Sequence, residues 1–187
     1  MNTKAIKKGW RGFGIHLDTL MTSKDKLSKM DGAAADLCVI ENEDEFSEND
    51  IEAPAGALFN ITDQKTLYSK NANDEREIAS ITKIMTALLA MKYADLSQEV
   101  TISYTPEGLE SSAVLCGFEQ GDKMMLSSLL SAALIYSGND AAIDIAIAVA
   151  GSQEAFVDMM NQESKELMTS HTHFANPTGL TQSKHYS

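Results

Sequence analysis

The chain has 187 residues, which is long enough for one domain with its own hydrophobic core. Apolar residues make up 43% of the chain, yet no apolar run approaches the roughly 18 residues of a membrane span. The net charge of −12 excludes a nucleic-acid partner, because binding to a phosphate backbone requires a basic surface.

Residues 1–53 differ in composition from the rest of the chain. They begin with a basic stretch and end in an acidic run over residues 41–52, which has little to bury. A basic start is typical of secretory signals, but polar residues interrupt the apolar segment between Phe13 and Met21. We therefore predict a disordered leader and acidic linker over residues 1–53, without a clear signal peptide, and a folded part over 54–187.

The folded part begins with strand patterns and continues with apolar helices. Two strand-like runs, 57–62 and 66–69, flank a polar turn and predict a hairpin. The expected helices cover residues 78–91, 126–136, 141–150 and 153–168, and a further short strand covers residues 100–104. The helix over 78–91 contains few polar residues, so we expect it to be buried on nearly every side. Strands followed by several helices indicate an α+β domain.

The cysteines and histidines do not predict a metal site or a disulfide framework. Cys38 and Cys116 are the two cysteines, and neither has a His or Cys neighbour at metal-ligand spacing. His171 and His173 form the one close histidine pair, without an evident third ligand. We therefore expect unpaired thiols, no metal and no other cofactor.

A serine and a lysine stand three residues apart at the start of the first predicted helix. Positions i and i+3 share one helix face, so the Ser80 hydroxyl and the Lys83 amine can meet. A serine needs a base beside it, and a lysine serves as that base only when its amine is partly neutral. Burial and the helix N-terminus both lower a lysine pKa. We predict Ser80 as nucleophile and Lys83 as base, although the pair alone also fits a surface lysine whose stem covers apolar area.

A second polar motif, Ser137-Gly138-Asn139, stands between two apolar helices. Its hydroxyl can pass a proton to a leaving group, and its asparagine amide can bind a substrate carbonyl or hold the lysine. Taken alone, the motif is more simply an ordinary turn between helices. The two motifs together, in this order, favour a catalytic site.

Ser-x-x-Lys followed by Ser-x-Asn resembles the motif set of the penicillin-binding proteins and serine β-lactamases. Three longer runs are similar to the low-molecular-weight D-Ala-D-Ala carboxypeptidases within that superfamily. These runs are Ala79–Ala90, Ser137–Ala142 and Thr172–Leu180. The resemblance covers about residues 55–187. It implies the DD-peptidase fold, which has a central antiparallel sheet and a helical subdomain.

The resemblance also implies a reaction and its partners. Ser80 would attack the penultimate D-alanine of a peptidoglycan pentapeptide, with Lys83 as base and the Ser80 N–H as one oxyanion-hole donor. Ser137 would protonate the leaving D-alanine, and Asn139 would contact the substrate and steady the lysine. β-Lactam antibiotics would acylate the same serine, and the enzyme would work outside the cytoplasmic membrane. The segment 176–180 is interpreted as architectural.

The chain also departs from the family pattern. The family carries a later Lys-Thr-Gly strand that binds the substrate carboxylate, and neither this motif nor a membrane anchor occurs in the 187 residues. Ile78 stands where the family usually has proline. We therefore expect an incomplete version of the fold, which is unstable or aggregates when it is produced alone.

Three alternatives stay open. A β-lactamase shares the nucleophile, but its Glu-x-x-x-Asn deacylation motif has no clear counterpart, since Glu163 and Glu166 stand in a plain helical run. A muropeptide endopeptidase uses the same acyl-enzyme. A non-catalytic truncated remnant is the alternative from a different class.

Overall fold

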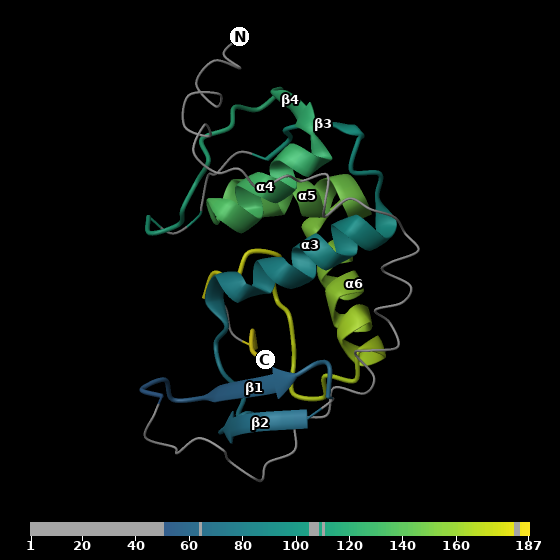
Figure 1. Ribbon diagram of the computed structural model, residues 1–187. Helices are drawn as coiled ribbons and strands as arrows, with labels where there is room; N and C mark the ends of the chain where they lie inside the picture. The colour runs from purple at the N-terminus through teal and green to yellow at the C-terminus, as the bar shows by residue number, and fades with distance from the viewer. Residues whose placement is uncertain (1–50, 64, 105–108, 110, 182–183) are drawn as a thin grey trace. The chain divides into compact units, whose positions relative to one another are not determined.

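The computed structural model describes residues 51–187, apart from residues 64, 105–108, 110 and 182–183. The predicted leader lies almost entirely outside the described residues, as does Cys38, so the division of the chain at residue 53 stays a prediction. The described part contains five helical segments and two small antiparallel sheets (Figure 1). The α+β prediction is confirmed.

The predicted hairpin is present. Strands β1 (Gly56–Asn60) and β2 (Lys65–Lys70) pair antiparallel, with an irregularity between Leu58 and Phe59. The Asn60 side chain shapes the turn, because its Oδ1 accepts from the N–H groups of Thr62 and Asp63 at 3.0 and 3.1 Å. A polar turn between two strands therefore forms the structure that the sequence pattern indicated.

The helix that carries the first motif begins with a tighter turn than expected. A 3₁₀ turn, η3 (Ala79–Ile81), leads into helix α3 (Thr82–Tyr93). The prediction that this helix is buried on nearly every side is wrong for the described residues, because Ile81 and Ile84 are both 64% exposed. The physical reason is that α3 packs on α4, α5 and α6, and these helices cover only one of its faces.

The three later helices confirm the predicted ones. They are α4 (Leu126–Ile135), α5 (Asn139–Ala150) and α6 (Gln153–Glu166). Gly151 ends α5 in the left-handed conformation at φ +83°, and Ser152 caps α6 by accepting from the Ala155 N–H. None of the helices in the described part of the chain has the length and apolarity to cross a membrane.

A second sheet precedes α4. Strand β3 (Glu99–Thr101) pairs antiparallel with β4 (Lys123–Met125). The first strand matches the predicted run over 100–104, whereas the second was not predicted. With three residues that continue directly into α4, β4 is too short to display an alternating pattern.

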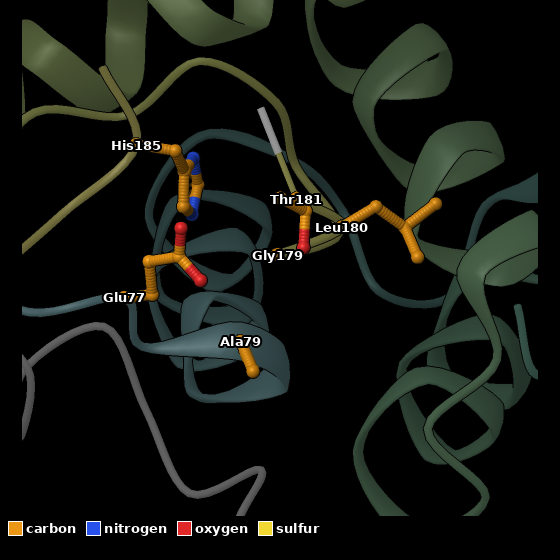
Figure 2. Close-up of a pocket in the computed structure, with 6 residues that line it drawn as sticks. All are labelled: Glu77, Ala79, Gly179, Leu180, Thr181 and His185. Atoms are coloured by element: carbon orange, nitrogen blue, oxygen red, sulfur yellow. The ribbon is translucent and has the colours of Figure 1, made fainter. Parts of the chain in front are cut away.

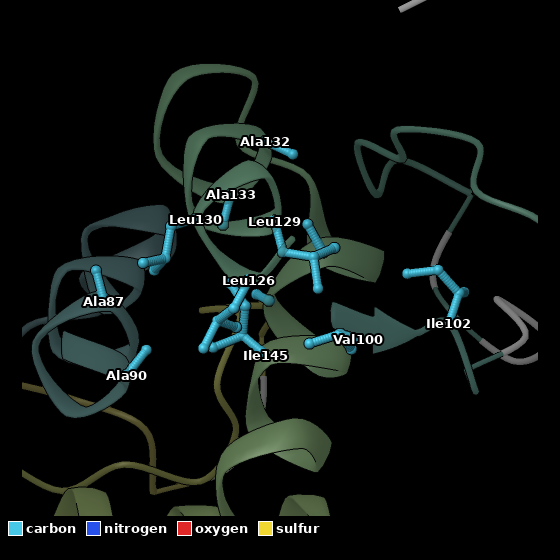
Figure 3. Packing of buried hydrophobic residues seen from close by; sticks show 12 residues of the cluster. Ala87, Ala90, Val100, Ile102, Leu126, Leu129, Leu130, Ala132, Ala133 and Ile145 are labelled. Atoms are coloured by element: carbon cyan, nitrogen blue, oxygen red, sulfur yellow. The ribbon is translucent and has the colours of Figure 1, made fainter. Parts of the chain in front are cut away.

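Two apolar clusters hold α3 in place. The first joins α3 to α4, α5 and β3 through alanines of α3 and larger side chains of the other elements, as Figure 3 shows. Leu126 and Leu129 are fully buried there, and burial of each contributes about 1.5–3 kcal/mol. The second cluster joins α3 to α5, α6 and a following loop; its buried members are Leu89, Ala146, Phe156, Met160 and Phe174. Because α3 carries the first motif and α5 begins with the second, this packing fixes both motifs.

Candidate active site

The Ser80 hydroxyl and the Lys83 amine meet, as their spacing predicts. Ser80 lies exposed in η3, whereas Lys83 is only 2% exposed in the first turn of α3. Lys83 Nζ lies 3.1 Å from Ser80 Oγ. A buried amine thus contacts a hydroxyl that a substrate can reach from solvent.

Ser137 joins this pair from the segment between α4 and α5. Its Oγ donates to Ser80 Oγ at 2.9 Å, and its backbone is left-handed, with φ +64°. The neighbouring Gly138 is tightly enclosed, since a Cβ at this position would lie 2.2 Å from Cys116 Sγ. Glycine is therefore required for Ser137 to reach Ser80 in this arrangement.

Asn139 is buried at the first position of α5. Its Oδ1 accepts from Lys83 Nζ at 2.9 Å, and its Nδ2 donates to the Val114 carbonyl at 3.1 Å. A carbonyl only accepts, so the Val114 contact fixes which end of the amide faces the lysine. The structure therefore brings together Ser80, Lys83, Ser137 and Asn139, the four residues that the sequence analysis selected.

Asp140 holds the segment that orients Asn139. Its carboxylate accepts from the N–H groups of Cys116 and Gly117 at 2.9 and 3.0 Å. The Asn139 N–H donates to Val114 O at 2.9 Å in the same region. The sequence does not predict this role, because the contact joins residues more than 20 positions apart.

A second acceptor for Lys83 comes from a segment that the sequence analysis treated as architectural. The Thr178 carbonyl accepts from Lys83 Nζ at 2.7 Å. Asn176 Oδ1 shapes this loop by accepting from the N–H groups of Thr178 and Gly179 at 3.0 and 2.7 Å. The segment is architectural, but it also places a main-chain oxygen on the predicted base.

Gly179 lets the loop lie against η3, the turn that carries the predicted nucleophile Ser80. Its φ is +84°, and a Cβ at this position would lie 1.8 Å from the Ala79 carbonyl oxygen. A side chain of any size would therefore push the loop away from η3. The turn composition Asn-Pro-Thr-Gly signals a tight loop, but not this contact.

Burial of Lys83 disfavours its charged form and so favours the neutral amine that a base requires. It lowers the pKa of Lys83 from 10.5 to about 8, whereas a negative charge on Cys116 as a thiolate acts in the opposite direction. Burial also raises the pKa of Cys116 to about 12, so the thiol is uncharged at neutral pH. Asn139 and Thr178 offer Lys83 oxygens without a formal charge, so a fraction of the amine is neutral near pH 7.

The two acceptors direct the lone pair of that neutral amine. A neutral lysine has two N–H bonds and one lone pair. If Asn139 Oδ1 and the Thr178 carbonyl take the two N–H bonds, the lone pair faces Ser80 Oγ. A hydroxyl with a base lone pair aimed at its proton is an activated nucleophile. The Ser80 N–H lies in the first turn, where N–H groups have no partner within the helix, so it can serve an oxyanion.

The chain is similar to known proteins in sequence and in fold. Residues 42–187 match a family model described as D-alanyl-D-alanine carboxypeptidase, peptidase family S11. The chain belongs to this carboxypeptidase family. It is 40% identical over 141 residues to the D-alanyl-D-alanine carboxypeptidase DacF of Bacillus subtilis, a match over 73% of this chain and 36% of DacF.

Solved structures of DD-peptidases share the fold. A variant of the Streptomyces K15 DD-transpeptidase superposes with a TM-score of 0.69 at 29% identity, over 73% of this chain and 56% of that one. Penicillin-binding protein D2 of Listeria monocytogenes, in the cefotaxime-bound form, gives 0.60 at 26% identity, over 72% and 55%. The DD-peptidase fold is thus confirmed. The chain spans about a third of the length of the curated carboxypeptidase that it matches.

Proposed function

We propose that the protein is a serine-type D-alanyl-D-alanine carboxypeptidase that forms an acyl-enzyme on Ser80. One observation carries this proposal: Ser80 Oγ lies within hydrogen-bonding distance of both Lys83 Nζ, at 3.1 Å, and Ser137 Oγ, at 2.9 Å. The membership of the carboxypeptidase family supports the choice of substrate. The substrate is a peptidoglycan stem peptide that ends in D-Ala-D-Ala.

The first step forms the acyl-enzyme. Neutral Lys83 takes the proton of Ser80 Oγ, which attacks the carbonyl carbon of the penultimate D-alanine. The resulting oxyanion lies opposite the Ser80 N–H, and Asn139 contacts the peptide beside it. These roles follow from a base that is buried and a nucleophile that is exposed.

The second step releases D-alanine. Ser137 Oγ passes a proton to the departing amine as the carbon–nitrogen bond breaks, and the Lys83 ammonium, which lies on the same Ser80 oxygen, returns a proton to Ser137. An ester on Ser80 remains. Water then attacks the ester carbonyl and Lys83 accepts the water's proton. Lys83 returns this proton to Ser80 Oγ as the ester bond breaks, so Ser80 leaves as the free hydroxyl.

β-Lactams enter the same first step, because their strained amide occupies the position of the D-Ala-D-Ala bond. The similarity to a penicillin-binding protein with bound cefotaxime supports this reactivity. Since the substrate is cell-wall peptide, we place the enzyme outside the cytoplasmic membrane.

The β-lactamase alternative gains no support from α6. Both oxygens of the buried Glu163 carboxylate accept from Lys92 Nζ, at 3.0 and 2.9 Å. Lys92 lies nine residues after Lys83 on α3, which separates the two along the helix by roughly 13 Å. Glu163 therefore has a structural partner away from Ser80.

A fluorescent penicillin tests the proposal. We expect the wild-type protein to become labelled at Ser80, as peptide mapping by mass spectrometry will locate, and Ser80→Ala to remain unlabelled. Ser128→Ala, an exposed serine on α4, is the matched control and should label normally. Labelling that survives in Ser80→Ala, or no labelling of the wild type, would overturn the proposal. Release of free D-alanine from a peptide ending in D-Ala-D-Ala distinguishes the carboxypeptidase from the endopeptidase.

A further inference from the structure

His185 is a buried histidine whose backbone is fixed on its C-terminal side. His185 is only 5% exposed. The next residue, Tyr186, pairs with His173 through two hydrogen bonds of 2.8 and 3.0 Å, and Ser187 pairs with Arg76 through two of 3.0 Å. Figure 2 shows the His185 ring above Glu77, beside the loop that contains Gly179.

Both ring nitrogens of His185 have partners, and the partners determine the tautomer. Nδ1 lies 3.0 Å from the Ala175 N–H, and Nε2 lies 2.7 Å from Thr82 Oγ1. A backbone N–H only donates, so Nδ1 must be the unprotonated, accepting nitrogen. The proton of the neutral ring is therefore on Nε2, which donates to Thr82.

These two contacts join the segments that hold the base. Thr82 is fully buried and directly precedes Lys83. Ala175 directly precedes Asn176, whose side chain shapes the loop that carries the Thr178 carbonyl. The same loop lies against Thr82, because a Cβ on Gly179 would be 2.9 Å from Thr82 Oγ1. The ring thus connects the first turn of α3 to the start of the loop.

We propose that the neutral imidazole of His185 is a positioning residue that keeps the 175–179 loop on α3, so that the Thr178 carbonyl stays on Lys83 Nζ. This inference rests on the proposed acylation of Ser80 by way of Lys83. It gives a role to a residue whose ring touches none of the reacting atoms.

Protonation of the ring breaks this arrangement. A second ring proton, on Nδ1, would face the Ala175 N–H, and two donors repel each other. Burial lowers the pKa of His185, as does the neighbouring His173, whereas Glu77 acts in the opposite direction. The other charged groups that line the open side of the ring are Glu75, Arg76 and Lys184. The imidazole is therefore neutral at pH 7 and releases the loop only in acid.

The ionisations of Lys83 and His185 then determine how the acylation rate falls as the pH is lowered. Acylation requires neutral Lys83, so the rate falls tenfold per pH unit below about 8. Below the pKa of His185, which is lower than 6.5, a second proton also inactivates the enzyme. The slope of log rate against pH then steepens from one to two.

The test is the second-order rate constant for acylation by a fluorescent penicillin, measured from about pH 9 down to below the pKa of His185, which titration of the imidazole signal by nuclear magnetic resonance locates. We expect the wild type to show the steeper slope in acid. His185→Gln keeps the donor to Thr82 but cannot titrate; it should be about tenfold slower at pH 7 and keep a slope of one in acid. His171→Gln, an exposed histidine, is the matched control. A wild-type slope of one throughout, or an unchanged profile in His185→Gln, would overturn the inference.

A second measurement does not depend on activity. Hydrogen exchange of the Ala175 and Gly179 amides, corrected for the intrinsic effect of pH, reports whether the loop remains on α3. In the wild type and in His171→Gln, their protection should fall below the pKa of His185. In His185→Gln, which cannot titrate, it should stay constant in acid. Protection that stays constant in acid would contradict the role of His185, whereas absence of Ser80 labelling with normal loop protection would contradict only the proposed function.

Discussion

Two segments hold Lys83, and they do so with different parts of the chain. Asn139 accepts from the amine with a side-chain oxygen at 2.9 Å, and Thr178 accepts with a main-chain oxygen at 2.7 Å. The first contact depends on the identity of one residue. The second depends on the shape of a loop, which Asn176 and Gly179 determine. Substitutions on the two sides should therefore act in different ways.

Removal of Lys83, the proposed base, should have the largest effect. Lys83→Gln keeps a polar side chain of similar length but offers no basic nitrogen, so acylation at pH 8 should fall by about 10²–10⁴-fold. The measurement is the rate of labelling by a fluorescent penicillin. Lys165→Gln, an exposed lysine on α6, should react at the wild-type rate. A Lys83→Gln protein with wild-type kinetics would exclude this lysine as the base.

On the loop side, Gly179→Ala should be the most damaging change. The new Cβ would overlap the Ala79 carbonyl oxygen at 1.8 Å, so the loop must move away from η3. A shift of about 1 Å in a positioning group costs about 10²-fold in rate. Gly151→Ala is the matched control, because Gly151 has nearly the same φ, +83° against +84°, but no atom within 4 Å of its Cβ position. Equal acylation rates in the two variants would argue against a role for the loop contact.

Asn139→Asp alters the side-chain contact to Lys83 and should change how the acylation rate depends on pH. A carboxylate beside Lys83 favours the ammonium, so it raises the pKa of Lys83 above the wild-type value of about 8. Neutral lysine then becomes rarer at pH 7, and acylation should be about tenfold slower there. The pH–rate profile measures this shift of the midpoint to higher pH. A midpoint that stays in place would show that Asn139 does not govern the protonation of the lysine.

The smallest effect should come from the Thr178 side chain. Thr178→Val removes the hydroxyl that donates to Asn176 Oδ1 at 2.8 Å and accepts from the Leu180 N–H at 3.2 Å, but it keeps the carbonyl that holds Lys83. We expect a loss of about 0.5–1.5 kcal/mol in the free energy of unfolding, and an acylation rate within about threefold of wild type. Urea unfolding and the labelling rate measure the two quantities. A large kinetic effect would show that the side chain itself takes part.

This contrast also explains how much of the site could be predicted from the sequence. Ser80, Lys83, Ser137 and Asn139 are proposed to act through side chains at fixed spacings, so their types and order predict them as site residues. The Thr178 contact uses a carbonyl, which every residue has, and no residue type indicates it. The His185 and Asp140 contacts join residues far apart in the chain, and only the folded structure brings them together.

The fold divides in a similar way. Helices α4, α5 and α6 were predictable because apolar periodicity and the Gly151-Ser152 boundary are local signals. Strand β4 was not predicted, because three residues are too few to display an alternating pattern of apolar and polar side chains. The exposed Ile81 and Ile84 contradicted the prediction of a helix buried on nearly every side. An apolar sequence indicates that a helix face can be buried, but it does not indicate which other element of the structure covers that face.

The central claim is that Lys83 is partly neutral near pH 7 because burial disfavours its charge while two uncharged oxygens hold its amine. A titration of the lysine side chains by nuclear magnetic resonance tests it directly, with Lys83→Arg used to assign the signal. We expect the Lys83 resonance to titrate with a pKa of about 8. A pKa near the ordinary lysine value of 10.5 would contradict it.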